Sequence, residues 1–351
     1  MRLVAILPFL IAAPAMLSAQ QERHSIEGDN VAIYNLVGEV SVEAGQGSVV
    51  VQVTRGGSAA GQLRVEQGEI DDRQTLRVIY PSNHITYGKQ GSGSTQLEVR
   101  DDGTFGDEHG RYEHEHTHGR RVTIEDRGGG LDAHADLRIT VPAGQQVAIH
   151  LAVGTVTLAN VNGRISVDAH SAPVTATGAK GELSLDVGSG TVRASQIEGD
   201  LMVDTGSGSV EVSRYHGRTL SVDTGSGDVT GTELEAAELS IDTGSGSIRL
   251  TGVTAPEVSL ETGSGSVNTD LHREIHTLSV ETGSGNIAIT APPTLSARVE
   301  IQTASGDIES DFPLTVTRRA RDHVEGQIGD GKGSIAIETG SGGVRLLKSS
   351  Q

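Results

Sequence analysis

Two sets of side chains in this sequence could do chemistry, one acidic and one rich in histidine. The acidic set recurs at one position of a repeated motif. We call it the acidic column; it consists of Asp168, Asp186, Asp204, Asp223, Asp242, Glu261 and Glu281. Gln302 breaks this series, and Glu338 stands near its end. Carboxylate oxygens are the ligands that Ca²⁺ prefers, so the column is a candidate calcium site. The alternative, which we favour, is structural: each carboxylate accepts an N–H group from a nearby glycine turn.

The histidine-rich set lies in a polar, glycine-rich segment at residues 89–121. Its histidines are His109, His114, His116 and His118, and the last three alternate along the chain. An extended backbone would place these three imidazoles on one side, and imidazole is the commonest ligand for Zn²⁺, Cu²⁺ and Ni²⁺. Carboxylates that could complete a shell are Asp101, Asp102 and Asp107. The segment therefore predicts a metal site. The alternative is a solvated insertion, because so long a polar stretch is unusual for an ordered loop.

The acidic column belongs to an internal repeat. Thr-Gly-Ser-Gly recurs between Thr205 and Thr339, and the copies from 187 to 303 follow one another every 18 to 21 residues. Each unit has the pattern apolar, Ser, apolar, acid, Thr, Gly, Ser, Gly. Alternation places the two apolar residues and the Thr on one face of a strand, with the Ser and the acid on the other. Gly-Ser-Gly then predicts a corner, where glycine tolerates a positive φ, before a second short strand.

The repeat predicts an all-β fold. One unit of about 19 residues cannot bury its own apolar face, but stacked units, or rungs, cover one another at about 4.8 Å per rung. We therefore expect a β-solenoid, like a parallel β-helix, over residues 147–347. We expect residues 22–146 to form an irregular β-rich region, either first rungs with insertions or a cap. The His-rich insertion at 89–121 lies within this region. Aromatic residues make up 2% of the chain, in keeping with a thin aliphatic core.

The first residues and the charge indicate a compartment and exclude some partners. Residues 1–19 combine Arg2, an apolar stretch and the small pair Ser18-Ala19, which is the layout of a cleavable signal peptide. We expect an exported protein, periplasmic, cell-surface or secreted, with no transmembrane span in the mature chain. The net charge of −19 argues against nucleic acid as a partner.

Catalytic interpretations fit the sequence poorly. A β-helical polysaccharide lyase or hydrolase needs clustered carboxylates with a basic residue and aromatic platforms for sugars, whereas the acids here form a uniform column. The serine of Gly-Ser-Gly recurs on every unit, which indicates a corner and not a nucleophile. We expect no enzyme, and no cofactor beyond the metals considered above. Arg318-Arg319-Ala320-Arg321 interrupts the acidity and is predicted to lie in a loop, where an anionic envelope polymer could dock.

The repeats and their flanks resemble a known family. The features that carry the resemblance are the Asp/Glu-Thr-Gly-Ser-Gly motifs, the run Asp136–Gly144, Ser305-Gly306-Asp307-Ile308 and the final Thr339-Gly340-Ser341-Gly342. Together they are similar to the "putative adhesin" family of bacterial β-strand-repeat envelope proteins, a domain of unknown function. The resemblance covers nearly all of the mature chain. It implies an exported β-solenoid with a role in adhesion or envelope interactions, and it implies no catalytic residues.

Two functions remain open from the sequence. The first is a non-catalytic structural or adhesin-like binding module of the bacterial cell envelope or surface, which engages a protein, an envelope polymer or further copies of itself. The second is a periplasmic metal-binding protein that uses the His-rich insertion, with the solenoid as its scaffold.

The metal hypothesis predicts saturable binding of Zn²⁺, Ni²⁺ or Cu²⁺ by the purified protein near neutral pH. Affinity should collapse below about pH 5.5, because protonated imidazoles cannot bind a metal. Isothermal titration calorimetry measures both, and alanine at His109, His114, His116 and His118 is the control that should abolish the signal. Weak binding without a defined stoichiometry would favour the solvated insertion.

Overall fold

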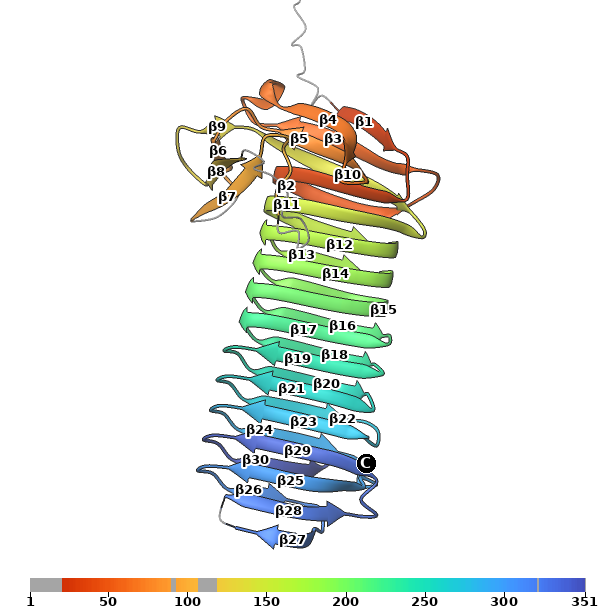
Figure 1. Cartoon of the computed structure of the whole chain (residues 1–351), viewed down its shortest axis with the longest axis vertical. Helices are drawn as coiled ribbons and strands as arrows, with labels where there is room; N and C mark the ends of the chain where they lie inside the picture. Colours follow the sequence, from red (N-terminus) through yellow and green to blue (C-terminus); the bar gives the residue numbers. More distant parts are fainter. Residues whose placement is uncertain (1–20, 90–92, 107–118, 321, 351) are drawn as a thin grey trace, which may run out of the picture.

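The described residues form mainly strands, and most of these strands stack as the rungs of a rod (Figure 1). The computed structural model describes residues 21–89, 93–106, 119–320 and 322–350. The predicted β-solenoid is confirmed. The one helix in these ranges is the short 3-10 helix η1 (Ala60–Gln62), so none is long and apolar enough to cross a membrane. The predicted signal peptide, residues 1–19, lies outside the described residues.

Each rung contributes strands to two parallel sheets that face each other across the core. The first, which we call the acidic sheet because it carries the acidic column, contains in stacking order the first half of β11 (Gln145–Ala159), β12 (Asn162–Ser171), β14 (Lys180–Ser189), the second half of β15 (Val192–Ser207), β17 (Thr219–Ser226), β19 (Glu238–Thr243), β21 (Glu257–Thr262), β23 (Thr277–Thr282), β29 (Gly333–Thr339) and β25 (Ala297–Thr303).

The second sheet, which we call the mixed-charge sheet, follows the same order of rungs. It contains the second half of β11, β13 (Val174–Thr177), the first half of β15, β16 (Val210–His216), β18 (Val229–Glu235), β20 (Ile248–Thr254), β22 (Val267–Leu271), β24 (Ile287–Ala291), β30 (Val344–Lys348) and β26 (Ile308–Ser310).

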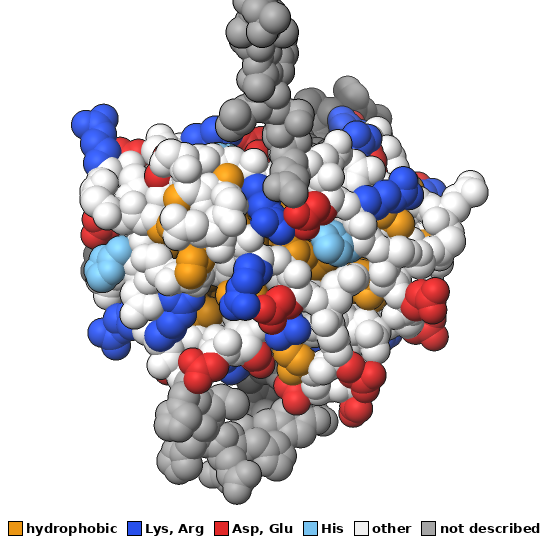
Figure 2. Space-filling model, turned by 90° about the horizontal axis from the view of Figure 1, so that it is seen from above, with side chains coloured by type: hydrophobic (Ala, Val, Ile, Leu, Met, Phe, Trp, Pro, Cys, Tyr) orange, Lys and Arg blue, Asp and Glu red, His pale blue; other side chains and the backbone are white. Residues whose placement is uncertain are grey.

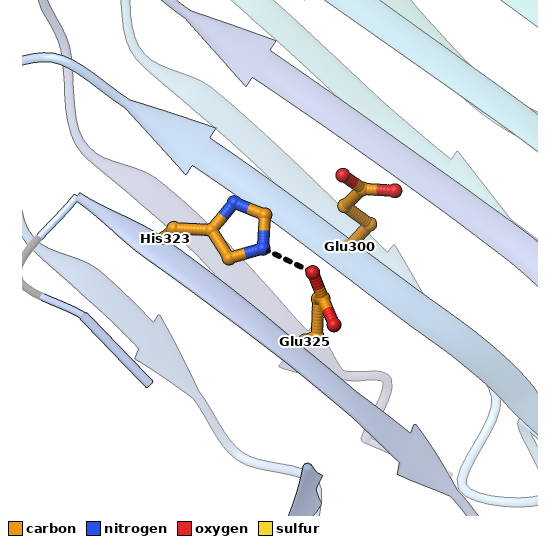
Figure 3. Close-up of side chains that lie close together, drawn as sticks. All are labelled: Glu300, His323 and Glu325. Atoms are coloured by element: carbon orange, nitrogen blue, oxygen red, sulfur yellow. Dashed lines mark hydrogen bonds and ion pairs between the residues drawn. The ribbon is translucent and has the colours of Figure 1, made fainter. Parts of the chain in front are cut away.

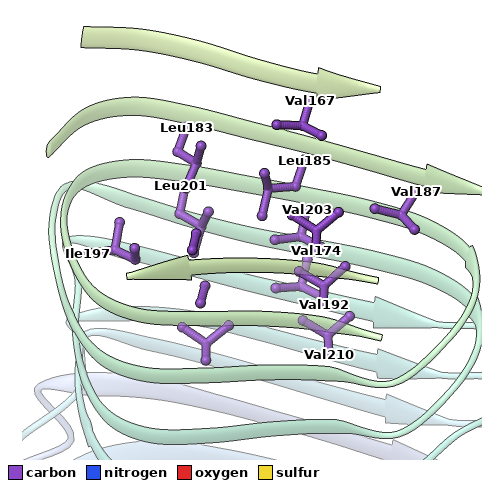
Figure 4. Packing of buried hydrophobic residues seen from close by; sticks show 14 of the residues in the cluster. Val167, Val174, Leu183, Leu185, Val187, Val192, Ile197, Leu201, Val203 and Val210 are labelled. Atoms are coloured by element: carbon purple, nitrogen blue, oxygen red, sulfur yellow. The ribbon is translucent and has the colours of Figure 1, made fainter. Parts of the chain in front are cut away.

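The core is a thin aliphatic layer between the two sheets. Leu220, Val222 and Thr224 of β17 are buried and alternate with outward Ser221 and Asp223, as the pattern predicted. Figure 4 shows the equivalent residues of neighbouring rungs stacked above one another in the interior. Each fully buried aliphatic side chain contributes roughly 1.5–3 kcal/mol. Because every rung repeats the same inward set, this layer stabilises the rod without disulfides.

From Thr224 onward, the inward threonine of each corner donates its hydroxyl to a glycine carbonyl of a neighbouring rung. Thr262 donates its buried hydroxyl to the carbonyl of Gly246 on the preceding rung at 2.9 Å. The glycines are needed for close approach: a Cβ on Gly244 would lie 2.6 Å from the carbonyl oxygen of Gly225, one rung earlier. The sequence predicted a positive φ for the corner glycines, but Gly225 and Gly244 do not have one. Stacking distance, and not backbone handedness, excludes a side chain here.

The last rungs do not follow the order of the sequence. β29 pairs with β23 on one edge and with β25 on the other, and β30 likewise lies between β24 and β26. The chain therefore skips one place in the stack, forms the outermost rung, and returns to fill the gap. β28 (His323–Ile328) runs antiparallel along β25 and is itself covered by β27 (Thr315–Arg319). This antiparallel hairpin covers the open edge of the terminal rung.

The N-terminal end is built on a further rung. β2 (Asn30–Gly45) pairs in parallel with β11 along both sheets. The strands added to it are β1 (Gln21–Ile26), β3 (Val49–Gly56), β4 (Arg64–Ile70), β5 (Arg73–Ile79) and β10 (His134–Pro142), which include antiparallel pairs. Buried Asn35 donates to the carbonyl of Ala135 at 2.7 Å, and the Tyr80 hydroxyl donates to Asn35 at 2.9 Å. This region therefore combines a rung with a cap.

A separate four-stranded sheet stands beside the cap. It contains β6 (His84–Thr86), β7 (Ser94–Arg100), β8 (Gly119–Glu125) and β9 (Leu131–Asp132). Parts of the predicted insertion at 89–121 thus form β7 and the start of β8, and Val99 on β7 is buried. The described ends of the insertion pack as ordered structure.

The corner contact predicts different effects for two threonines at equivalent positions. Thr262→Val removes the hydrogen bond to Gly246 and should lower the free energy of unfolding by about 1 kcal/mol. Thr205 is equally buried, but its hydroxyl has no hydrogen-bond partner among the described residues, so Thr205→Val should be neutral or stabilising. Urea unfolding of both variants measures the difference. Equal losses would show that the hydroxyl contact does not close the corner.

Candidate functional site

The acidic column is continuous and longer than predicted. Neighbouring rungs place its carboxylates directly opposite one another, as with Asp204, Asp223 and Asp242. Glu281 is followed by Glu338, because β29 lies next to β23, and only then by Gln302. Gln302 therefore terminates the column and does not interrupt it. Eight carboxylates in succession, from Asp168 to Glu338, lie about 4.8 Å apart on the outer face of the acidic sheet.

The predicted hydrogen bonds from the corners to the column are wrong. Corner N–H groups donate to backbone carbonyls of the neighbouring rung, for example Gly244 to Thr224 at 3.0 Å. Within the described residues, no hydrogen bond joins the carboxylate of Asp223 or Asp242 to a corner. The carboxylate that does accept a corner N–H is Asp228, from Ser247 at 2.8 Å, and it follows the glycines and lies outside the column. The carboxylates of Asp223 and Asp242 therefore lie on the outer face of the acidic sheet without a hydrogen bond to a corner.

Neighbouring carboxylates in the middle of the acidic column repel one another, and this affects their pKa values. Partial burial, together with the neighbouring charge of Asp223, raises the pKa of Asp242 above its ordinary value. The charge of Asp242 is the main cause of a raised pKa at Glu261, with smaller contributions from burial and Glu281. Charges this close repel by roughly 1 kcal/mol per pair in water. The column therefore stores repulsion that a bound cation would relieve.

The rest of the surface is not acidic in the same way. On the mixed-charge sheet, Arg193 pairs with Glu211 at 3.0 Å and Arg345 with Glu309 at 3.3 Å, each across neighbouring rungs. Seen from the N-terminal end, basic and acidic side chains are interspersed over the cap (Figure 2). The two sheets thus present different charge patterns from the same repeat, and among the described residues the continuous row of one sign lies on the acidic sheet.

Aromatic residues close the N-terminal end of the column. His150 lies opposite Asp168 on the next rung, and its Nδ1 is 3.1 Å from the Asp168 carboxylate. Tyr34 stacks on the imidazole with ring centroids 4.3 Å apart, and Phe105 meets Tyr34 edge-on. Phe105 comes from the predicted insertion, which therefore contacts the solenoid where the column begins.

A hollow lies between the small sheet and the first carboxylates. It has a volume of about 450 Å³ and is lined by Glu98 and Arg100 of β7, by Phe105, and by Asp168, His170 and Asp186 of the acidic sheet. Its polar walls and the two column carboxylates suit a cationic group. The start of the acidic column thus lines a hollow that β7 and Phe105 help to form.

The predicted histidine site cannot be placed. His109, His114, His116 and His118 lie outside the described residues, as does Asp107. Asp102 is described, and its carboxylate accepts hydrogen bonds from the backbone and hydroxyl of Thr104 at 2.9 and 2.7 Å. Asp102 is therefore engaged in a local turn. The metal site at these histidines stays a prediction.

The structure brings together one cluster that the sequence did not indicate. Glu300, His323 and Glu325 offer ligand atoms that all lie within 4.8 Å of one another (Figure 3). The three residues share no repeated spacing, and only the antiparallel return of β28 along β25 joins them. The predicted loop at Arg318 and Arg319 is wrong, because both residues lie on β27 of this hairpin. Arg318 Nη1 is 3.5 Å from Glu325 Oε1.

The fold and its columns define a repeat solenoid that displays outward side chains in rows. The chain belongs to the Toastrack DUF4097 family, which matches residues 136–347. The resemblance found in the sequence is thereby confirmed. No curated protein matches the chain.

Three solved structures are similar to this chain. Two are putative adhesins from Parabacteroides distasonis and Parabacteroides merdae, each 14% identical with a TM-score of 0.39; the matches cover 93% of this chain and 96% and 95% of theirs. The third is a putative cell adhesion protein from Clostridium sporogenes, 8% identical with a TM-score of 0.22, over 94% of this chain and 99% of that one.

Repulsion in the column predicts that Asp242→Asn stabilises the protein at pH 7, by on the order of 1 kcal/mol at moderate ionic strength. A raised folded-state pKa means that the native state binds more protons than the unfolded state just above the ordinary pKa of 3.8. The wild type therefore loses stability as pH rises through that window, and the gain from Asp242→Asn should shrink as the pH falls toward 3.8.

Unfolding at several pH values and salt concentrations measures this gain. Glu211→Gln is the matched control, since it removes a carboxylate that is paired with Arg193 and should bring no stabilisation. If Asp242→Asn were destabilising at pH 7, the carboxylate would have to make a favourable contact in the folded protein.

Proposed function

We propose that this chain is a non-catalytic, exported binding module of the bacterial cell envelope or surface, and that the acidic sheet is its docking face. The observation that carries the proposal is the run of eight carboxylates, from Asp168 to Glu338, in register on one sheet of a rigid rod. A row of this kind provides many equivalent weak contacts, which suits an extended partner better than a single small molecule.

The charge of the column selects the chemistry of the partner. Lys or Arg side chains, or amino groups on an envelope polymer, would relieve the repulsion between neighbouring carboxylates. A second copy of this chain could meet the column through basic residues such as Arg318 and Arg319, which are exposed on β27. The adhesin-like resemblance of the family supports a binding role of this kind.

Export is supported by the sequence of the first nineteen residues. Arg2 and the apolar stretch that follows have the features of a cleavable signal peptide. An exported rod that lacks cysteine must hold its fold through stacking alone, and the buried layer between its two sheets supplies that stability.

Metal binding by the His-rich insertion is the second candidate function. It is supported by the alternation of His114, His116 and His118 and by the place where the described chain enters this segment: Gly106 packs against the side chains of His150 and Asp168. The titration described above for the four histidines distinguishes it from the first candidate.

Cell fractionation followed by crosslinking tests location and partner together. We expect the protein in the periplasmic or surface fraction, crosslinked to an envelope component. Recovery in the cytoplasm, with Arg2 and the apolar segment still attached, would contradict the proposal.

A binding assay on isolated envelopes tests the docking face. Asp204, Asp223 and Asp242 changed together to Asn should weaken binding at least tenfold, and added salt should weaken wild-type binding. The matched control changes three exposed acids of the mixed-charge sheet, Glu211, Glu235 and Glu309, to Gln. It removes the same charge and should bind like the wild type; equal losses would show that only net charge matters.

A further inference from the structure

The terminal hairpin places two glutamates directly opposite each other. In the antiparallel register of β25 and β28, Glu300 faces Glu325, and the next outward pair is Gln302 and His323. Residues two apart on a strand lie on the same face, so all four side chains share one patch. Like charges directly opposite each other across two strands are destabilising, and this position therefore needs positive charge.

Three neighbours orient the glutamates. His323 Nε2 lies 2.7 Å from Glu325 Oε1, Arg318 approaches the same oxygen at 3.5 Å, and Gln302 donates to Glu300 Oε1 at 2.9 Å. The hydrogen bond from His323 is the main cause of the lowered pKa of Glu325. Within the described contacts, Arg318 and His323 thus both act on Glu325, and the facing Glu300 is bonded only to the neutral amide of Gln302.

The three ligand groups converge from two strands. In Figure 3 the imidazole and the Glu325 carboxylate face each other, with Glu300 beside them on the neighbouring strand. The side chain of His323 is 15% exposed and that of Glu325 38% exposed, so the cluster is reachable from solvent but held by its surroundings. Their ligand atoms all lie within 4.8 Å of one another. Ligands around tetrahedral Zn²⁺ lie about 3.3–3.5 Å apart, a spacing that small rotations of the two glutamates can reach.

We propose that Glu300, His323 and Glu325 form a Zn²⁺ site that joins the terminal rung to its covering hairpin. The metal takes one oxygen from each carboxylate and the lone pair of His323 Nε2, and water completes the tetrahedron. Binding requires His323 to be neutral at Nε2, so a protonated imidazole must first release its proton to solvent. The two carboxylates then balance the charge of the ion, and the repulsion between Glu300 and Glu325 becomes an attraction to a shared cation.

The donor set selects zinc over calcium. Calcium takes six to eight oxygen ligands, whereas this cluster offers one imidazole nitrogen and two carboxylates. Imidazole and carboxylate together suit Zn²⁺, which accepts three protein ligands and a water. The site is separate from the His-rich insertion, and it does not depend on the proposed docking face.

Calorimetric titration with Zn²⁺ tests the site in the full mature chain. The background carries alanine at His109, His114, His116 and His118, so that those side chains contribute no heat. We expect about one equivalent to bind at pH 7.5, and His323→Ala and Glu300→Gln each to abolish saturable binding. His272→Ala is the matched control: His272 lies 3.1 Å from Asp270, also two residues apart, and no third ligand joins them within the described clusters.

Two further results separate this site from an ordinary ion pair. Zn²⁺ should raise the melting temperature of the background protein but not of Glu300→Gln, because the ion binds only the folded hairpin. Affinity should fall on acidification, because protons compete with the ion for its ligand atoms; the charged neighbours of His323 are Glu325, Arg318, Glu300 and Glu338. Circular dichroism confirms that each variant is folded. Absence of saturable binding in the background protein, or binding that Glu300→Gln and His323→Ala leave intact, overturns the proposal.

Discussion

The contact between successive rungs is the constraint on which the rest of this structure depends. Parallel strands in register bring each residue to about 4.8 Å from its equivalent on the next rung, and the corners bring backbone against backbone. At Gly244 no side chain fits against the Gly225 carbonyl, and at Thr262 the hydroxyl must reach the Gly246 carbonyl. The same register forces identical carboxylates into a column. Stability and surface charge therefore arise from a single repeated geometry.

The parts of the structure that follow from alternation were predictable from the sequence. The inward Leu220, Val222 and Thr224 and the outward Asp223 could be assigned because a strand has a period of two. Periodicity also showed which residues are equivalent, but it does not say which rung lies next to which. Glu338 was therefore placed after Gln302, although it stacks on Glu281. The hydrogen-bond partner of Asp228 and the meeting of Glu300 with Glu325 depend on tertiary contacts that no local pattern encodes.

One repeat thus supports several surfaces with separate roles. The acidic sheet presents a continuous row of carboxylates, while outward charges of the mixed-charge sheet form pairs such as Arg193 with Glu211. Strands that include antiparallel pairs are added at the N-terminal end, and at the C-terminal end the β27–β28 hairpin covers β25 of the acidic sheet, so these edges are not free to extend the stack. At one end Phe105, which follows β7 of the small sheet, contacts Tyr34 and His150, and at the other end β28 and β25 bring three ligand groups together. Variation in a solenoid family can therefore concentrate in the caps and outward columns while the inward layer stays the same.

The rung formed by β29 and β30 lies out of sequence order, and this limits the order in which the chain can fold. A protein that emerges from its N-terminus through a narrow pore can add rungs in sequence, each templated by the one before. β25 and β26 cannot reach their final parallel neighbours in this way, since β29 and β30 must first occupy the gap between them and β23 and β24. The rod is therefore completed only when the last twenty or so residues have emerged. β29 and β30 therefore hold the terminal rung in place. A chain truncated before them would leave β25 and β26 without their parallel partners.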